Sequence, residues 1–190
     1  GFVKNDKVID LKSRLPYNDF VSFLAAGAHE QARQLMDREE GDHLYDSLAL
    51  LPVVPNPGKI ICVGINYEDH RIEAGRDRTE HPMIFARFPE SQTAHRAPIK
   101  RAPKVSTQLD YEAELAVIIG HRARHLRSDQ ALDCVAGYSL FNDASIRDFQ
   151  RKTSQWTIGK NFDATGPFGP WLVTCDELPL GAAGLRIQSR

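Results

Sequence analysis

Two glutamates, Glu112 and Glu114, stand just before an apolar run and could hold a cation together. The run at 115–119 is β-branched and ends at Gly120, a pattern that predicts a buried strand. On a strand, residues two apart point to the same face, so the two carboxylates would lie side by side and repel one another. A divalent cation with oxygen ligands, such as magnesium, manganese or calcium, would remove this repulsion. The alternative is that Asp110, Glu112 and Glu114 form the solvated face of an edge strand.

Two further pairs of polar residues have helical spacing. Asn66 can cap a helix on which His70 and Glu73, three apart, would share one face. A carboxylate beside an imidazole raises its basicity, which suits a general base, although an exposed pair without function has the same spacing. Arg147 and Gln150 are also three apart and would project together.

Asp143 stands at a boundary between two expected elements. A strand is expected at 138–141, and a helix at 146–152 with Ser145 as its cap. The end of a strand is a rigid mount for an oxygen ligand, so Asp143 is a further candidate for cation binding.

Composition argues against several classes of partner. The 190 residues carry a net charge of −1, and the apolar runs are short and broken by charge, so neither a nucleic-acid nor a membrane partner is indicated. The N-terminal residues lack the charged-then-apolar layout of a signal peptide. Cys62, Cys134 and Cys175 are far apart, which is typical of reduced thiols in a cytoplasmic protein and not of a disulfide framework or a zinc site.

A proline-rich stretch at 48–58 divides the chain into a small α+β N-terminal domain, 1–54, and a second domain, 55–190. The elements expected in the first domain are a hairpin at 2–11 with its turn at Asn5-Asp6, and a helical stripe over 20–36, capped by Asn18 or Asp19 and weakened by Gly27. The elements expected in the second domain, besides those above, are strands at 59–64, 83–87, 156–160 and 171–174, a helix at 128–134 capped by Ser128, a loop at 162–170 and a strand that begins at 185.

Several sequence motifs occur in order between residues 59 and 174. They are Gly64-Ile65-Asn66-Tyr67-x-x-His70-x-x-Glu73, Asp110-Tyr111-Glu112-Ala113-Glu114 with its strand to Gly120, Gly137-Tyr138 through Asn142-Asp143-x-Ser145-x-Arg147-Asp148-x-Gln150, Trp156-x-x-Gly159-Lys160-x-Phe162-Asp163, and Gly166-Pro167-x-Gly169-Pro170-Trp171. Together these motifs resemble the fumarylacetoacetate hydrolase superfamily. Its members include acylpyruvate and fumarylpyruvate hydrolases, oxaloacetate decarboxylases and hydroxyheptadienedioate isomerases.

The resemblance implies an α+β fold that is mainly β, in which a mixed β-sandwich roll follows the small N-terminal domain. It also implies that the roll continues beyond residue 190, so that the C-terminal part of the roll is absent from this sequence.

The resemblance assigns roles to single residues. The matches are Glu112, Glu114 and Asp143 to the metal ligands, His70 and Glu73 to the catalytic pair on a mobile helix, Lys160 to the active-site lysine, and Arg147 and Gln150 to positions that hold substrate oxygens. Arg87 stands where many members have a lysine, and it is left outside the expected catalytic set.

On this basis we expect a hydrolase that uses Mg²⁺ or Mn²⁺, with Ca²⁺ as a substitute. It would cleave a C–C bond of an acylpyruvate-type 2,4-dioxo acid such as fumarylpyruvate, through a metal-stabilised enolate. His70, assisted by Glu73, would activate the attacking water, and Lys160 would steady the developing oxyanion.

Other reactions remain open. Oxaloacetate decarboxylation and 2-hydroxyhepta-2,4-diene-1,7-dioate isomerisation need the same cation but no attacking water. A non-catalytic relative would bind the metal without turning over any of these substrates. The resemblance further implies a small 2-oxo acid as the partner, a role in the catabolism of aromatic compounds, and a homodimer.

Overall fold

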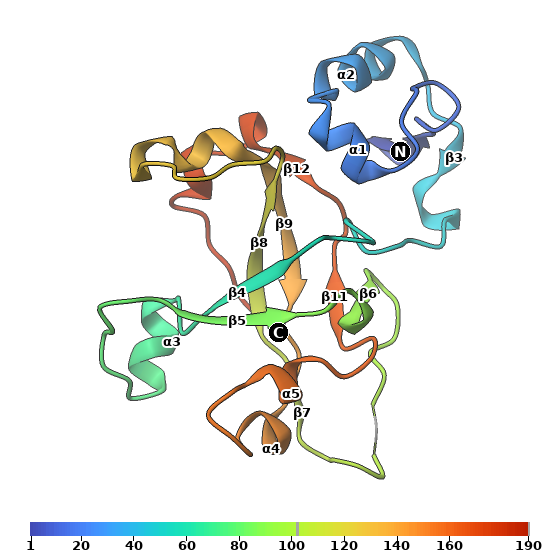
Figure 1. Cartoon of the computed structure of the whole chain (residues 1–190). Helices are drawn as coiled ribbons and strands as arrows, with labels where there is room; N and C mark the ends of the chain where they lie inside the picture. Colours follow the sequence, from blue (N-terminus) through green and yellow to red (C-terminus); the bar gives the residue numbers. More distant parts are fainter. Residues whose placement is uncertain (102, 190) are drawn as a thin grey trace.

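The structure is a computed structural model that describes residues 1–101 and 103–189, and it combines short strands with short helices (Figure 1). In chain order, the strands and α-helices are β1 (Phe2–Lys4), β2 (Lys7–Ile9), α1 (Phe20–Ala25), α2 (His29–Arg38), β3 (His43–Leu44), β4 (Ile60–Gly64), α3 (Glu68–Glu73), β5 (Met83–Arg87), β6 (Gln92–Ala94), β7 (Leu109–Asp110), β8 (Ala113–Ile119), β9 (Val135–Asn142), β10 (Ser145–Ile146), α4 (Arg147–Gln150), α5 (Thr157–Lys160), β11 (Gly166–Phe168) and β12 (Val173–Thr174). The 3₁₀ helices lie at Tyr45–Ser47, Pro89–Ser91, Ser128–Cys134, Cys175–Glu177 and Leu180–Ala182.

The N-terminal hairpin is confirmed. β1 and β2 pair antiparallel, and the turn between them contains Asn5 at φ 55°. Asparagine tolerates this left-handed conformation better than most residues, so the residue type determines where the chain reverses. β3 then pairs with β2 as a third strand.

The predicted helical stripe forms two helices, α1 and α2. Asp19 caps α1, because its carboxylate accepts a hydrogen bond from the backbone N–H of Ser22 at 2.7 Å. Gly27 lies between the helices at φ 62°, a left-handed conformation that ends a helix. The prediction of one helical stripe over 20–36 is therefore wrong at Gly27, where the chain leaves the helical conformation.

One buried apolar cluster joins the N-terminal helices to the larger sheet. Phe23 and Leu24 of α1 belong to the same cluster as Ile118 of β8 and Phe168 of β11. Because burial of apolar surface is the main favourable term in folding, this shared cluster fixes the N-terminal unit against the sheet.

β9 is the centre of the larger sheet. β8 pairs antiparallel with it from Ala113 opposite Asn142 to Ile119 opposite Val135, and β11 and β12 also pair with it. β6 pairs in parallel with β11. This pairing brings the start of β8 beside the end of β9, and the polar residues of the motifs lie at these two strand ends.

β8 was predicted to be buried but is covered on one face only, and β4 contains no fully buried residue. In β8, Ile118 is buried whereas Val117 is 49% exposed, and in β4 Ile61 is 63% exposed. β4 and β5 form a separate two-stranded ribbon that runs across β8 and β9 in the view of Figure 1. The apolar runs therefore predicted these strands correctly, but not which of their faces would be covered.

The segment 156–160 was predicted to be a strand, but it forms helix α5 after Trp156. Trp156 packs edge-on against Phe85, with 5.6 Å between the ring centroids. Gly159 lies so close to α4 that a Cβ atom there would be 2.3 Å from the backbone nitrogen of Gln150. An alternating pattern over so few residues does not separate strand from helix, and packing decides between them.

Two other expectations about this region are wrong. Ser145 lies in β10 and does not cap a helix, and α4 covers only part of the expected 146–152. The expected loop at 162–170 contains β11, because Gly166 and its neighbours pair with β6. A strand can contain proline at a position where no backbone N–H is needed as a donor.

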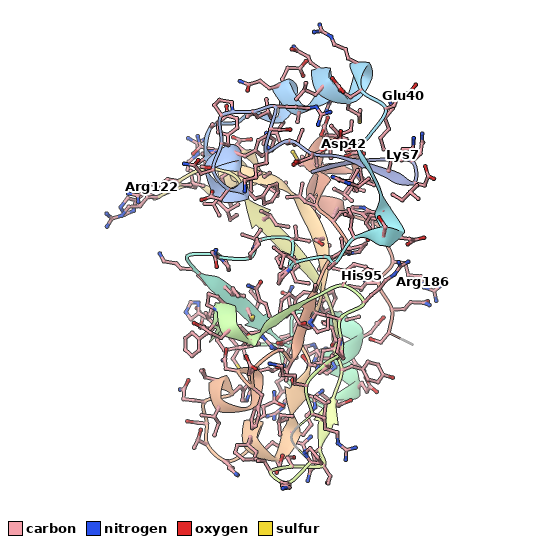
Figure 2. The ribbon with its side chains drawn as sticks, turned by 90° about the vertical axis from the view of Figure 1, so that its right-hand side faces the viewer. Lys7, Glu40, Asp42, His95, Arg122 and Arg186 are labelled. Carbon is pink, nitrogen blue, oxygen red and sulfur yellow. The ribbon has the colours of Figure 1, made fainter. Side chains whose placement is uncertain are left out.

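The link between β8 and β9 is an exposed loop followed by a 3₁₀ helix. Arg122 extends away from the body of the molecule in this loop (Figure 2). Arg127, and not Ser128 as expected, occupies the N-cap position of the 3₁₀ helix.

The strand expected to begin at 185 is not present. Residues 185–189 form no strand, and residue 190 lies outside the described residues. Within the described ranges, no helix combines the length and apolar character needed to cross a bilayer.

Candidate active site

The carboxylates near β8 and β9 meet where the two strands end. Glu112 precedes β8, and its N–H donates to the side-chain oxygen of Asn142 at 3.0 Å. The N–H of Asp143 donates to the backbone oxygen of Glu112 at 2.9 Å. Two backbone-anchored bonds thus bring Glu112 and Asp143 together, and Glu114 follows on β8.

Lys160 links these two carboxylates. Lys160 is the last residue of α5, and the residue is 1% exposed. The ammonium group donates to Oε2 of Glu112 at 2.8 Å and to Oδ2 of Asp143 at 2.6 Å. Three residues that the sequence singled out are therefore in direct contact.

Arg147 and Gln150 also lie at this cluster, and they contact one another, as their spacing predicted. Arg147 Nε donates to Asp110 Oδ2 at 2.9 Å, and Nη1 donates to Glu112 and to Gln150 Oε1, the latter at 3.0 Å. The guanidinium is partly exposed, so it lies at the edge of the cluster and can meet a bound anion.

Arg87 belongs to the cluster although the sequence analysis left it out. Its side chain has no exposed surface, and Nη1 donates to Asp143 Oδ1 at 2.6 Å. The available signal was a charged residue that ends an otherwise apolar strand. Such a residue is either solvated or paired inside, and the sequence does not distinguish the two.

Burial and negative charge act together on Glu114. Burial, followed by the charges of Glu112 and Asp143, raises the pKa of Glu114 to about 7. Burial also raises the pKa of Glu112, but the charges of Lys160 and Arg147 bring that pKa below its ordinary value. Burial and two neighbouring carboxylates thus disfavour the charged form of Glu114.

His70 and Glu73 are both on α3 and both exposed. Among the described residues, neither makes a hydrogen bond or ion pair with the carboxylate cluster. The structure thus places the predicted catalytic pair on one short helix and does not bring it to the other site residues.

Tyr67 connects α3 to the cluster and was not singled out from the sequence. It occupies the N-cap position that was expected for Asn66. Its hydroxyl accepts a hydrogen bond from the N–H of Leu115 at 3.0 Å and also contacts Glu114. The start of α3 is thus fixed beside a predicted metal ligand, while the body of the helix faces solvent.

The donor chemistry of the cluster fits a hard divalent cation. Glu112, Glu114 and Asp143 offer only oxygen atoms, the ligands that Mg²⁺ and Mn²⁺ prefer, and burial followed by the charges of the other two carboxylates raises the pKa of Glu114. No three His, Cys, Asp or Glu side chains in the described part of the chain are already spaced as a metal group. The ammonium of Lys160 instead lies between Glu112 and Asp143.

The cluster falls within a region that matches a known protein family. The profile described as fumarylacetoacetate (FAA) hydrolase, C-terminal, matches residues 59–190. The chain belongs to the fumarylacetoacetate hydrolase family. Enzymes of this family include hydrolases, isomerases and decarboxylases, and they typically use divalent metals.

Individual members of the fumarylacetoacetate hydrolase family agree with this assignment. The chain is 44% identical over 140 residues to oxaloacetate tautomerase YisK of Bacillus subtilis (strain 168). The aligned region covers 71% of this chain and 46% of YisK. It is 39% identical over 160 residues to the mitochondrial oxaloacetate tautomerase fahd2 of Xenopus laevis, with 82% and 50% covered. A solved fumarylacetoacetate hydrolase from psychrophilic Exiguobacterium antarcticum aligns with a TM-score of 0.69 and 31% identity, over 90% of this chain and 60% of its own. The chain thus spans about half the length of the curated relatives it matches, and the expected family fold is confirmed.

Proposed function

We propose that this family member is a divalent-metal-dependent enzyme that acts on a small 2-oxo acid. The favoured reaction moves a proton between the methylene carbon next to the keto group and the keto oxygen, as in the tautomerisation of oxaloacetate. The observation that carries the proposal is the buried cluster in which Lys160 joins Glu112 and Asp143, with Arg147 at its edge. The names of two relatives support oxaloacetate as the first substrate to test.

Two cationic side chains suit the two polar ends of such a substrate. Arg147, partly exposed and oriented by Asp110 and Gln150, can pair its planar guanidinium with the substrate carboxylate. Lys160 is held in a nearly water-free setting and can donate to the keto oxygen as negative charge develops there. Holding both ends fixes the carbon that exchanges the proton.

Glu112, Glu114 and Asp143 would hold Mg²⁺ or Mn²⁺, with Ca²⁺ as a substitute, and the cation when bound would act as a Lewis acid toward the keto group. The all-oxygen donor set, and the two other carboxylates whose charges act on Glu114, support this assignment.

Hydrolysis of the C–C bond in an acylpyruvate is the second candidate, and His70 and Glu73 are the observation in its favour. An attacking water needs a base, and this pair shares one face of α3. α3 is exposed but anchored through Tyr67 next to Glu114, so a closing movement of this helix would be needed to bring the base to the substrate.

A substrate panel tests the proposal. Oxaloacetate, an acylpyruvate, fumarylpyruvate and 2-hydroxyhepta-2,4-diene-1,7-dioate would each be assayed with Mg²⁺, with Mn²⁺ and with a chelator. We expect metal-dependent conversion between the enol and keto forms of oxaloacetate to be the fastest reaction. Cleavage of an acylpyruvate without tautomerase activity would favour the second candidate. Mn²⁺ binding without any turnover would indicate a non-catalytic metal-binding relative.

We also propose that the protein is a homodimer in which the outer face of the β4–β5 ribbon is covered. Ile61 and Val63 of β4 and Ile84 of β5 are exposed on this ribbon, and Val63 lies opposite Ile84. Contiguous exposed apolar residues of this kind are typical of interaction surfaces.

A further inference from the structure

The guanidinium of Arg87 is enclosed on three sides. Nε donates to Ser91 Oγ at 3.1 Å, Nη2 donates to Thr165 Oγ1 at 3.0 Å, and Nη1 donates to Asp143 Oδ1 at 2.6 Å. The ring of Phe141 lies against it, with its centroid 5.3 Å from the guanidinium carbon. Each edge of the planar group therefore has a partner, which offsets the cost of removing the charge from water.

The surrounding backbone is shaped to admit this side chain. A Cβ atom on Gly166 would lie 2.8 Å from Nη2 of Arg87, so the absence of a side chain there leaves room for the guanidinium. The carbonyl oxygen of Ala144 accepts a further bond from Nη1 at 3.2 Å. Arg87 is thus fixed by the fold itself and not only by its ion pair with Asp143.

The two oxygens of Asp143 have different partners. Oδ1 contacts Arg87, and Oδ2 contacts Lys160 at 2.6 Å. Lys160 divides its charge between Asp143 and Glu112 from the end of a flexible stem, so it can yield Oδ2 to another cation. Arg87 is enclosed and cannot yield Oδ1 in the same way.

We infer that Arg87 is a positioning residue that leaves Asp143 a single oxygen, Oδ2, for a metal ion and thereby favours Mg²⁺ and Mn²⁺ over Ca²⁺. Ca²⁺ takes more oxygen ligands than Mg²⁺ and often uses both oxygens of one carboxylate, whereas Mg²⁺ needs a near-octahedral set with few carboxylates. The inference rests on the proposed metal-dependent function, and Arg87 itself would contact neither metal nor substrate.

The ratio of the Ca²⁺ and Mg²⁺ dissociation constants tests this inference, measured by calorimetry on the purified protein. In Arg87→Met, Oδ1 is released and one positive charge is lost. The lost charge affects both dications alike and cancels in the ratio. We expect the ratio to shift toward Ca²⁺ by roughly tenfold or more, the scale on which neighbours of metal ligands act.

Two further variants separate positioning from a general loss of structure. Arg87→Lys retains a charged donor for Oδ1, so the wild-type preference should be largely rescued. Arg127→Met also removes one positive charge, but at an exposed arginine in the link between β8 and β9 that pairs with Asp129, and it should leave the ratio unchanged. A folded Arg87→Met variant with the wild-type ratio would overturn the inference.

Crystal structures of the wild-type protein with Mn²⁺ and with Ca²⁺ decide the matter even if Arg87→Met does not fold. We expect Oδ2 of Asp143 on the metal and Oδ1 on Arg87 in both. Coordination through both oxygens would overturn the inference while leaving the proposed function intact. A wild-type protein that binds neither Mg²⁺ nor Mn²⁺ would instead refute the proposed function, and the inference with it.

Discussion

Lys160 is the residue on which the electrostatics of the candidate site converge. Its ammonium bonds to Glu112 and Asp143, and the ring of Phe85 lies 5.1 Å away on an apolar side. In this buried setting an unpaired charge would be costly because it has lost its hydration, whereas its attraction to an oppositely charged group is stronger than in water. The lysine is therefore suited to stabilise an oxyanion at a defined position.

Replacing Lys160 with Met tests this role, since Met keeps much of the apolar stem and removes the charge. We expect turnover to fall by roughly two to three orders of magnitude, the usual cost of one oxyanion donor, with Mn²⁺ binding retained. Steady-state kinetics and calorimetry measure the two quantities. Lys152→Met is the matched control, because Lys152 is exposed beside Phe149. Near-normal turnover would assign Lys160 a structural role only.

His70 separates hydrolysis from a reaction of oxaloacetate that needs no base. A base that activates water contributes roughly a hundredfold to ten-thousandfold, so His70→Ala should suppress acylpyruvate hydrolysis by such a factor. Loss of carbon dioxide from oxaloacetate has neither an attacking water nor a proton to abstract, and we expect it to change by less than about tenfold. Glu73→Gln should follow the same pattern more weakly. Equal losses with both substrates would show that His70 acts through closure of α3 or substrate binding.

At the scale of single elements, the N-terminal unit is held together by a charged cluster at the end of β2. Arg14 donates to both oxygens of Asp42, at 2.8 and 2.9 Å, and to Glu39. Asp42 also accepts from the N–H of Asp10 at 2.7 Å (Asp42 is labelled in Figure 2). These bonds, led by the one from Arg14, lower the pKa of Asp42 to about 2.

This lowered pKa predicts how stability depends on pH. In the unfolded chain this carboxyl has an ordinary pKa of about 3.9. The contribution of Asp42 to the stability of the fold is therefore present above that pH and is lost as pH falls toward about 2. Asp42→Asn should therefore lower the free energy of unfolding near neutral pH, and the difference from wild type should shrink in acid. Denaturant titrations at pH 7, 5 and 3 measure this. Glu40→Gln is the matched control, since Glu40 is exposed (Figure 2). An equal deficit at every pH would contradict the ion-pair explanation.

At the scale of the whole molecule, the larger sheet around β9 and the β4–β5 ribbon each leave an apolar face exposed. The inner face of β8 joins the core that also holds α1 and β11, whereas Leu115 and Val117 on its other face are exposed. The β4–β5 ribbon exposes Ile61, Val63 and Ile84 in the same way. Since exposed apolar surface favours association, these faces are where assembly should be sought.

The homodimer proposal can be tested on the ribbon directly. The double change Ile61→Lys and Val63→Lys puts two charges on its outer face, and we expect the solution mass from light scattering to halve. Circular dichroism should remain that of the folded protein, because Ile61 is 63% and Val63 40% exposed. Val21→Lys on α1 introduces a lysine at another exposed site and should leave the mass unchanged. A wild-type protein that is already monomeric would contradict the proposal.

Local patterns in the sequence determined much of this protein. The spacing of Glu112 and Glu114, the apolar runs of β4, β5 and β8, and the turn at Asn5 all express relations between near neighbours, which backbone geometry fixes. The motifs likewise sufficed to indicate the family, because they follow one another in order along the chain.

Only the tertiary structure decided which residues meet across large separations. Arg87 and Asp143 are 56 residues apart. Whether that arginine would be solvated or enclosed depended on Thr165, which accepts a hydrogen bond from it, and on Gly166, which leaves room for it. The helical form of α5 was decided by packing of Gly159 against α4, and the open face of β8 by the placing of the other layers. Periodicity specifies which side chains share a face, but the partner of that face is chosen by the lowest free energy of the whole fold.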